Sequence, residues 1–142
     1  MTCAARFETR VPAPKGRIVA FFGDAQNLPR ISPPYPMIKI LSGETRVVAG
    51  AEFRIELNFV VFRTLWLTRV ERVEPDGSFV DTFSGGVFRH WRHTHRFLQD
   101  GDGTLIIDDV TYEPRTWLRP IAPTILRIMF AARRRALARE FS

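Results

Sequence analysis

Hydrophobic and polar residues alternate near the start of the chain. In residues 5–11, ARFETRV, charged side chains occupy every second position and small or apolar ones the positions between, a pattern typical of a half-buried strand. The segment PAPKG ends this strand. Residues 16–24, GRIVAFFGD, then predict a short helix, and the four prolines between Pro29 and Pro36 leave room for at most one helical turn. The apolar side of the short helix consists of Ile18, Val19, Phe21 and Phe22.

From Met37 to about Glu113 the pattern predicts six consecutive strands. The clearest alternation lies in residues 52–59, EFRIELNF, where charged or polar side chains occupy the positions between apolar ones. The turn sequences EPDG, GG and QDGDG separate the later strands. Because consecutive strands joined by short turns pair with their neighbours, we expect an antiparallel meander.

The period changes at the C-terminal end of the chain. Between Trp117 and Phe141, apolar residues recur every three or four positions, which predicts an amphipathic helix of about five to six turns. The predicted apolar stripe consists of Leu118, Ile121, Ile125, Leu126, Ile128, Met129, Phe130 and Ala132.

Together these elements predict an α+β fold formed by a single domain, residues 1–142. A six- or seven-stranded antiparallel sheet would wrap around the long C-terminal helix, with a short helical segment after the first strand. Because one helix is too narrow to cover such a sheet, a twisted sheet that curls around it leaves an apolar space. The order of elements therefore predicts a cavity, without saying what fills it.

The composition is that of an ordinary globular protein, with 45% hydrophobic and 25% charged residues. No apolar run approaches the roughly 18 residues that cross a bilayer, and MTCAARFETR lacks the apolar stretch of a signal peptide. We therefore expect a cytoplasmic protein. The single cysteine, Cys3, cannot form an internal disulfide, which agrees with a reducing compartment.

The net charge of +6 is concentrated in one segment. Residues 1–118 carry 15 basic and 14 acidic side chains, whereas residues 119–142 carry six arginines and a single acid, Glu140. This distribution argues against a nucleic-acid-binding face. The segment could contact an anionic membrane surface or RNA, although a solvated helix side is the simpler interpretation. Four of the six arginines would make a membrane contact, namely Arg133, Arg134, Arg135 and Arg139. The sequence does not indicate an oligomeric state.

All three histidines lie in one predicted strand, residues 88–97, FRHWRHTHRF. Because side chains alternate along a strand, Trp91, His93 and His95 share one face. The opposite face is rich in arginine and should face solvent, together with His90. The alternation therefore predicts two histidines among aromatic side chains on the inner face of the sheet.

Two aspartates are predicted to lie beside these histidines. In the next strand Asp108 belongs to the inward set. It lies opposite His93 if the hairpin turn centres on Asp100–Gly101, and opposite His95 if the pairing shifts by two. In the preceding strand, Asp81 comes near His93 or the neighbouring tryptophan when the strands pair through their Gly-Gly turn. We therefore expect a buried cluster of two histidines and two aspartates.

Three interpretations of this cluster are open. His93 and His95 with a carboxylate are workable zinc ligands. A His–Asp pair can also act in acid–base catalysis, since the carboxylate orients the ring and raises its basicity; the catalytic candidates are then His93, His95 and Asp108. The third interpretation is a satisfied polar network that closes the sheet and offers a hydrogen bond to a bound molecule. We favour the network, and we assign no metal and no cofactor.

Three segments resemble the SRPBCC superfamily, the helix-grip fold of START lipid-transfer domains, the birch-pollen allergen, and polyketide cyclases and aromatases. They are IVAFFGDAQNLPRISPP, FVDTFSGGVFRHWRHTHRF and GTLIIDDVTYEPRTW, and the second contains the W-x-H-x-H-x-F pattern of small bacterial members. The resemblance extends from about Ala5 to Phe141. It implies a sheet around the C-terminal helix and a deep pocket for a hydrophobic or amphipathic molecule, but it does not fix an activity. Bulky Trp117, in a loop that usually contains glycine, could narrow one mouth of this pocket.

On this basis we expect a carrier or sensor of a lipid, polyketide or isoprenoid-like ligand. The alternative is a cyclase, aromatase or dehydratase. In that case His93 or His95 is the general base, Asp108 orients it, and Tyr112 donates to a developing oxyanion. The side chains expected to line the pocket are Phe53, Ile55, Leu57, Phe59, Trp66, Asp81, Phe83, Trp91, His93, His95, Asp108, Tyr112, Ile125 and Met129.

Overall fold

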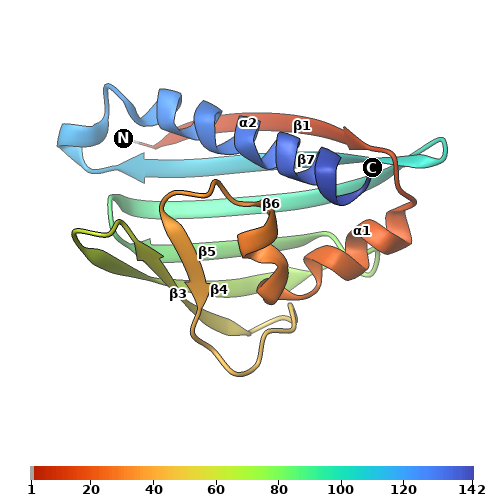
Figure 1. Cartoon of the computed structure of the whole chain (residues 1–142), viewed down its shortest axis with the longest axis horizontal. Coiled ribbons are helices and arrows are strands. Elements are labelled where there is room, and N and C mark those ends of the chain that lie inside the picture. Colours follow the sequence, from red (N-terminus) through yellow and green to blue (C-terminus); the bar gives the residue numbers. More distant parts are fainter. Residues whose placement is uncertain (1) are drawn as a thin grey trace.

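The computed structural model describes residues 2–142 and contains a seven-stranded antiparallel sheet that curls around the C-terminal helix (Figure 1). The strand order is β1-β7-β6-β5-β4-β3-β2, so β2 to β7 form a continuous meander and β1 pairs with β7. The predicted α+β helix-grip fold is confirmed. The strands are β1 (Cys3–Val11), β2 (Met37–Ile40), β3 (Glu52–Asn58), β4 (Arg63–Val73), β5 (Phe79–Gly85), β6 (Phe88–Asp100) and β7 (Gly103–Pro114).

Four helical segments accompany the sheet. Figure 1 shows α2 running along β1 and β7, with α1 beside it on the same side of the sheet. The 3-10 helix after α1 is tied to α2, because Arg30 pairs with Glu140. The segments are α1 (Lys15–Phe22), the 3-10 helices η1 (Ala25–Ile31) and η2 (Thr116–Leu118), and α2 (Ala122–Glu140).

Glycines with positive φ form the tight turns of the meander. Gly77, in the β4–β5 turn, has φ 93°, and a Cβ there would lie 2.4 Å from Val19 Cγ1 of α1. Gly86, in the β5–β6 turn, has φ 65°, and a Cβ there would lie 2.4 Å from Trp66 Nε1. At both positions the backbone and the neighbouring side chain exclude any residue larger than glycine. The indole nitrogen of Trp66 therefore faces this turn.

The structure corrects the predicted start and apolar stripe of the C-terminal helix. The helix begins at Ala122 rather than Trp117, and Ile121 and Ile128 are 52% and 62% exposed. The predicted stripe is therefore wrong for Ile121 and Ile128 and confirmed for Leu118, Leu126 and Phe130. Leu118 lies in the separate turn η2, so spacing by three and four does not continue across the break. The side chains that α2 buries are Ala122, Leu126, Phe130, Ala136 and Leu137.

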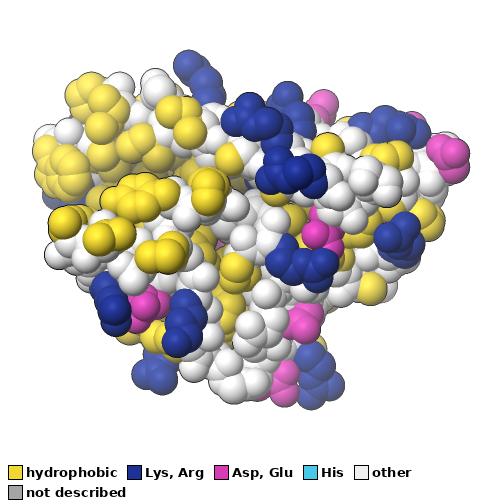
Figure 2. Space-filling model, in the orientation of Figure 1, with side chains coloured by type: hydrophobic (Ala, Val, Ile, Leu, Met, Phe, Trp, Pro, Cys, Tyr) yellow, Lys and Arg dark blue, Asp and Glu magenta, His cyan; other side chains and the backbone are white. Residues whose placement is uncertain are grey.

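The arginines of the C-terminal segment do not share one surface. Figure 2 shows lysine and arginine side chains over the C-terminal half of α2. Arg134, Arg135 and Arg139 are exposed, whereas Arg133 is half-buried and lines the internal cavities described below. The predicted four-arginine contact surface is therefore wrong for Arg133. Within residues 2–142, no helix is long and apolar enough to cross a membrane.

Candidate ligand-binding site

The inner face of β6 carries the predicted histidine pair. Trp91, His93, His95 and Phe97 are all buried, and His90 on the opposite face is exposed. The alternation predicted from the sequence is therefore confirmed along this strand. The two neighbouring strands bring one carboxylate each, Asp81 from β5 and Asp108 from β7.

Histidines and carboxylates pair crosswise rather than straight across the strands. In the backbone register His95 is opposite Asp108 and His93 is opposite Asp81, the second of the two alignments predicted for Asp108. The side chains instead reach their diagonal neighbours: His93 Nε2 lies 2.7 Å from Asp108 Oδ1, and His95 Nε2 lies 2.7 Å from Asp81 Oδ2. Each imidazole thus has its own carboxylate, which satisfies both Nε2 atoms.

Aromatic packing fixes the orientation of both rings. His95 lies between Phe79 and His93, with ring centroids 4.1 and 3.7 Å away and nearly parallel planes. Phe130 of α2 closes the other side of His93, at 5.6 Å and edge-on. The rings cannot rotate without displacing these neighbours, so the nitrogen positions are preorganised.

The electrostatics of the cluster favour ionised carboxylates beside a neutral His95. Burial raises the pKa of the Asp81 carboxyl, but the charge and hydrogen bond of His95, with His93 and Arg133, lower it below its ordinary value. Burial also raises the pKa of the Asp108 carboxyl. The hydrogen bond and charge of His93, with the charges of His95 and Arg133, outweigh this effect and lower the pKa below its ordinary value. Burial and the adjacent His93 lower the pKa of His95, against the opposing effect of Asp81.

These protonation states fix the role of each nitrogen of His95. With Asp81 ionised and His95 neutral near neutral pH, Nε2–H donates to Asp81 and Nδ1 carries a lone pair. Nδ1 is buried and finds no hydrogen-bond partner within residues 2–142; Asp108 Oδ1 lies 3.5 Å away. A buried acceptor without a donor is unusual and marks a position where a ligand could donate.

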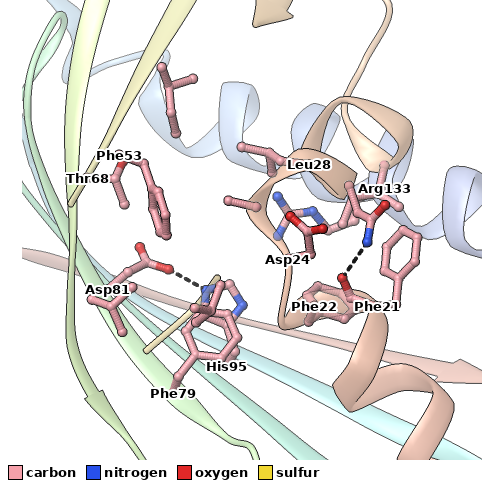
Figure 3. A pocket seen from close by; sticks show the side chains of 16 residues that line it. Phe21, Phe22, Asp24, Leu28, Phe53, Thr68, Phe79, Asp81, His95 and Arg133 are labelled. Carbon is pink, nitrogen blue, oxygen red and sulfur yellow. Dashed lines mark hydrogen bonds and ion pairs between the residues drawn. The ribbon is translucent and has the colours of Figure 1, made fainter. Parts of the chain in front are cut away.

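Two adjoining cavities lie between the sheet, η1 and α2. The larger has a volume of about 170 Å³ and extends from the histidine pair to Met129, Trp91 and the Ser32–Pro33 segment. The smaller, of about 90 Å³, extends from His95 toward Phe21 and Asp24 (Figure 3). Both are lined by Leu28, Ile31, Ile55, Thr68, Asp81, His95 and Arg133, which form the wall between them. We call these residues the shared wall.

Most side chains predicted to line a pocket face these cavities. The residues concerned are Phe53, Ile55, Leu57, Trp66, Asp81, Phe83, Trp91, His93, His95 and Met129.

Four others, and Trp117, line neither of these two cavities. Phe59 follows the end of β3 and packs on Phe62 and Tyr35. Asp108 lies behind His93, while Tyr112 and Ile125 belong to the apolar core near the start of α2. Trp117 is 67% exposed and lines neither cavity, so this geometry gives no support to the predicted narrowing of a mouth by this residue. The predicted contacts of Tyr112 with an oxyanion and of Asp108 with a ligand are likewise not supported by this geometry.

Sequence reasoning missed Arg133 and the wall formed by η1. Leu28 and Ile31 lie in a proline-containing segment without clear periodicity, so their inward direction had no sequence signal. Arg133 did have one, because it follows Leu126 by seven residues and Met129 by four, which places it on the inner side of α2. The incorrect part of the predicted apolar stripe obscured this inward position of Arg133.

The cluster also has donor atoms suited to a metal ion. Asp81, His93 and His95 each offer one atom, and these atoms lie within 4.8 Å of one another. Two imidazoles and a carboxylate are a common zinc-ligand set. Each imidazole is hydrogen-bonded to a carboxylate through Nε2, which leaves Nδ1 as the ring nitrogen of His95 without a hydrogen-bond partner in the described residues.

A curled antiparallel sheet closed by one long helix, with an internal cavity beside a polar cluster, defines the chain as a helix-grip protein. It belongs to the polyketide cyclase / dehydrase and lipid transport family, which matches residues 11–141. No curated protein matches the chain.

Several solved structures share this fold. Protein CV1439 from Chromobacterium violaceum is 17% identical with a TM-score of 0.80, covering 97% of this chain and 96% of its own. Zhui aromatase/cyclase from Streptomyces sp. R1128 is 14% identical with a TM-score of 0.78, and the match covers 99% of this chain and 93% of the aromatase/cyclase chain. A START superfamily protein from Mycobacterium smegmatis is 17% identical with a TM-score of 0.71, covering 97% and 96%. At these identities the likeness establishes the fold.

We expect the free energy of unfolding to decrease on acidification in two stages. Below the ordinary histidine pKa of about 6.5 the unfolded chain protonates His95 before the folded protein does, so stability falls. Below about pH 4 the unfolded chain protonates Asp81 and Asp108 first, and stability falls again. Each proton that the unfolded chain binds and the folded protein does not lowers the free energy of unfolding by at most about 1.4 kcal/mol per pH unit. Urea unfolding at a series of pH values measures this profile.

The matched variants for this profile are His95→Gln and His90→Gln. His95→Gln removes the titrating group but keeps a donor for Asp81, so it should flatten the profile between about pH 7 and pH 5. His90 is exposed, and its replacement should leave the profile unchanged. If His95→Gln and the wild type showed the same slope, the assignment of this stage to His95 would be wrong.

Proposed function

We propose that this protein binds a hydrophobic or amphipathic small molecule between the sheet and α2, as a carrier or sensor. The single observation that carries the proposal is the internal cavity of about 170 Å³, with aromatic and aliphatic walls and a polar cluster at one side. Apolar walls supply burial energy, and a few placed polar groups fix the orientation of a ligand. Membership of a family described by lipid transport and cyclase activity supports this function.

The dimensions of the cavity limit the ligand. Sites for drug-sized molecules usually enclose roughly 300–1,000 Å³, which exceeds the volume of the larger cavity. A compact ligand fits this space as it stands. A longer one requires side chains of the shared wall to move, so that the space of about 90 Å³ beyond His95 becomes continuous with it.

The proposal predicts that a bound organic molecule survives purification. Native and denaturing mass spectrometry of protein prepared without added ligand should differ by the mass of one small molecule, lost on denaturation. Met129→Trp fills part of the larger cavity and should abolish most of this excess mass. Ile128→Trp is the matched control, because Ile128 is 62% exposed. Equal excess mass in both variants, or an excess that matches one divalent metal, would contradict binding in this cavity.

A second candidate function is catalysis in the same cavity. It is favoured by His95, whose Nε2 is held by Asp81 while Nδ1 has no hydrogen-bond partner in the described part of the chain and lies 3.5 Å from Asp108 Oδ1, the arrangement of an oriented general base. In this version Asp81 replaces Asp108 as the orienting group for His95. A dehydratase would return an added β-hydroxy ketone with the mass of one water removed. Recovery of that probe unchanged under conditions where it binds would exclude this reaction.

A further inference from the structure

Arg133 brings a positive charge into the cavities. It lies on the inner side of α2, one turn after Met129, and it is half-buried. Figure 3 shows its side chain reaching from α2 into the space lined by Leu28 and Asp24. Its guanidinium carbon lies 5.2 Å from the centroid of the Phe130 ring. This contact positions the guanidinium beside both cavities.

One nitrogen of the Arg133 guanidinium is not hydrogen-bonded by the described residues around it. Its Nη1 atom is buried and has no hydrogen-bond partner among residues 2–142. Asp81 and Asp108 feel its charge, which lowers the pKa of both, but their close contacts are to the two histidines. Asp24 accepts a hydrogen bond from the Gln26 backbone N–H. Buried donors without acceptors are rare and costly, so this one indicates a missing acceptor.

The unpaired indole nitrogen of Trp66 does not serve the same purpose. It faces the Gly86 turn, so Trp66 offers the cavity its ring rather than its donor. Arg133 is a cationic, donor-only side chain that lines both cavities, and its natural complement is an acceptor with negative charge.

We infer that Arg133 binds the carboxylate of an acidic amphipathic ligand, whose apolar part lies against Trp66, Phe83 and Trp91 in the larger cavity. This inference rests on the proposed binding function and specifies its ligand class. A carboxylate fits because the planar guanidinium donates two parallel hydrogen bonds to it. A phosphate fits less well, since its second negative charge would lie beside the two ionised aspartates with one arginine to balance it.

Ligands that differ only in their polar end test this inference. Octanoate and octanol have the same apolar chain, and their binding to the full-length protein can be measured by isothermal titration calorimetry. Wild-type protein should bind octanoate about tenfold to a hundredfold more tightly than octanol, the range expected for a charged hydrogen bond. Arg133→Gln should remove this preference by weakening octanoate binding, while octanol binding stays the same. Arg134→Gln, one residue on and exposed, should leave both affinities unchanged.

A lysine variant distinguishes the effect of the paired guanidinium donors from the effect of the positive charge alone. Arg133→Lys keeps the positive charge that acts on Asp81 and Asp108 but loses the paired donors, so octanoate binding should weaken several-fold. If Arg133→Gln does not fold, this variant still tests whether Arg133 binds the carboxylate. An arginine that only balances the aspartates would give equal octanoate affinity in wild type and Arg133→Lys.

The outcomes distinguish this inference from the proposed function. If wild-type protein binds octanoate and octanol equally, or if neither Arg133 variant changes the preference, the carboxylate assignment is wrong and the cavity still binds amphipaths. If neither probe, nor a fatty acid or alcohol of another chain length, binds the wild type, the proposed binding function fails and the carboxylate assignment with it.

Discussion

Replacing Asp108 by alanine is expected to lower the free energy of unfolding by about 3–5 kcal/mol, the loss typical of removing one partner of a buried charged pair. Asp108 is 2% exposed and lies 2.7 Å from His93 Nε2. Without the carboxylate, the imidazole remains packed against His95 and Phe130 and loses its hydrogen-bond partner. Its unpaired nitrogen then carries the full cost of desolvation. Urea unfolding monitored by tryptophan fluorescence measures the loss.

Asp109→Ala is the matched control for this variant. The two aspartates are adjacent on β7, but Asp109 points outward and pairs with Arg6 and Arg96 at the surface. Surface ion pairs contribute about 1 kcal/mol or less, so this substitution should cost far less than Asp108→Ala. Equal losses in the two variants would show that the buried His93–Asp108 pair does not stabilise the fold.

The second large effect concerns the phase of α2. Leu126 has no exposed surface and packs in the cluster with Trp91, Val110 and Phe130. Leu126→Ala should therefore reduce the free energy of unfolding by about 2–5 kcal/mol through lost burial and the space it leaves. Ile128→Ala, two residues on and 62% exposed, should change it by no more than about 0.5 kcal/mol. A larger loss for Ile128→Ala than for Leu126→Ala would contradict the outward direction of Ile128.

The sheet could be predicted because its strands and their pairing follow from residues that are close together in the sequence. Alternation along residues 52–59 and 88–97 assigns each side chain to a face, and short glycine turns require neighbouring strands to pair. The same two facts predict that His93, His95, Asp81 and Asp108 lie together. The order of elements predicts that the sheet curls around the last helix, and the family resemblance implies the same closure.

The register of the β6–β7 hairpin could not be determined from the sequence pattern. Asp100 pairs with Gly103, so the turn consists of Gly101 and Asp102, one position later than the centre on Asp100–Gly101. Gly101 has φ 62°, which suits the first position of a type II′ turn. Moving a two-residue turn by one position moves every cross-strand partner by two, which is why Asp108 lies opposite His95.

The walls contributed by helices were the least predictable part of the site. An arginine in a run of arginines has the composition of a solvated face, and only its helical phase reveals that Arg133 points inward. That phase depends on where α2 begins, and the break between η2 and Ala122 was not visible in the apolar pattern. The cavity itself follows from tertiary packing of η1 against the sheet and α2, for which residues 25–31 carry no periodic signal.

The pairing of β1 with β7 also affects how the protein folds during synthesis. Cys3 pairs with Tyr112 and Val11 with Thr104, so the strand that emerges first from the ribosome bonds to the strand of the sheet that emerges last. The meander from β2 to β6 can form progressively as each hairpin becomes available, but β1 must remain unpaired until Gly103–Pro114 has been made. Contacts between such distant segments are slow to form, and closure of the sheet around α2 is therefore a late event in folding.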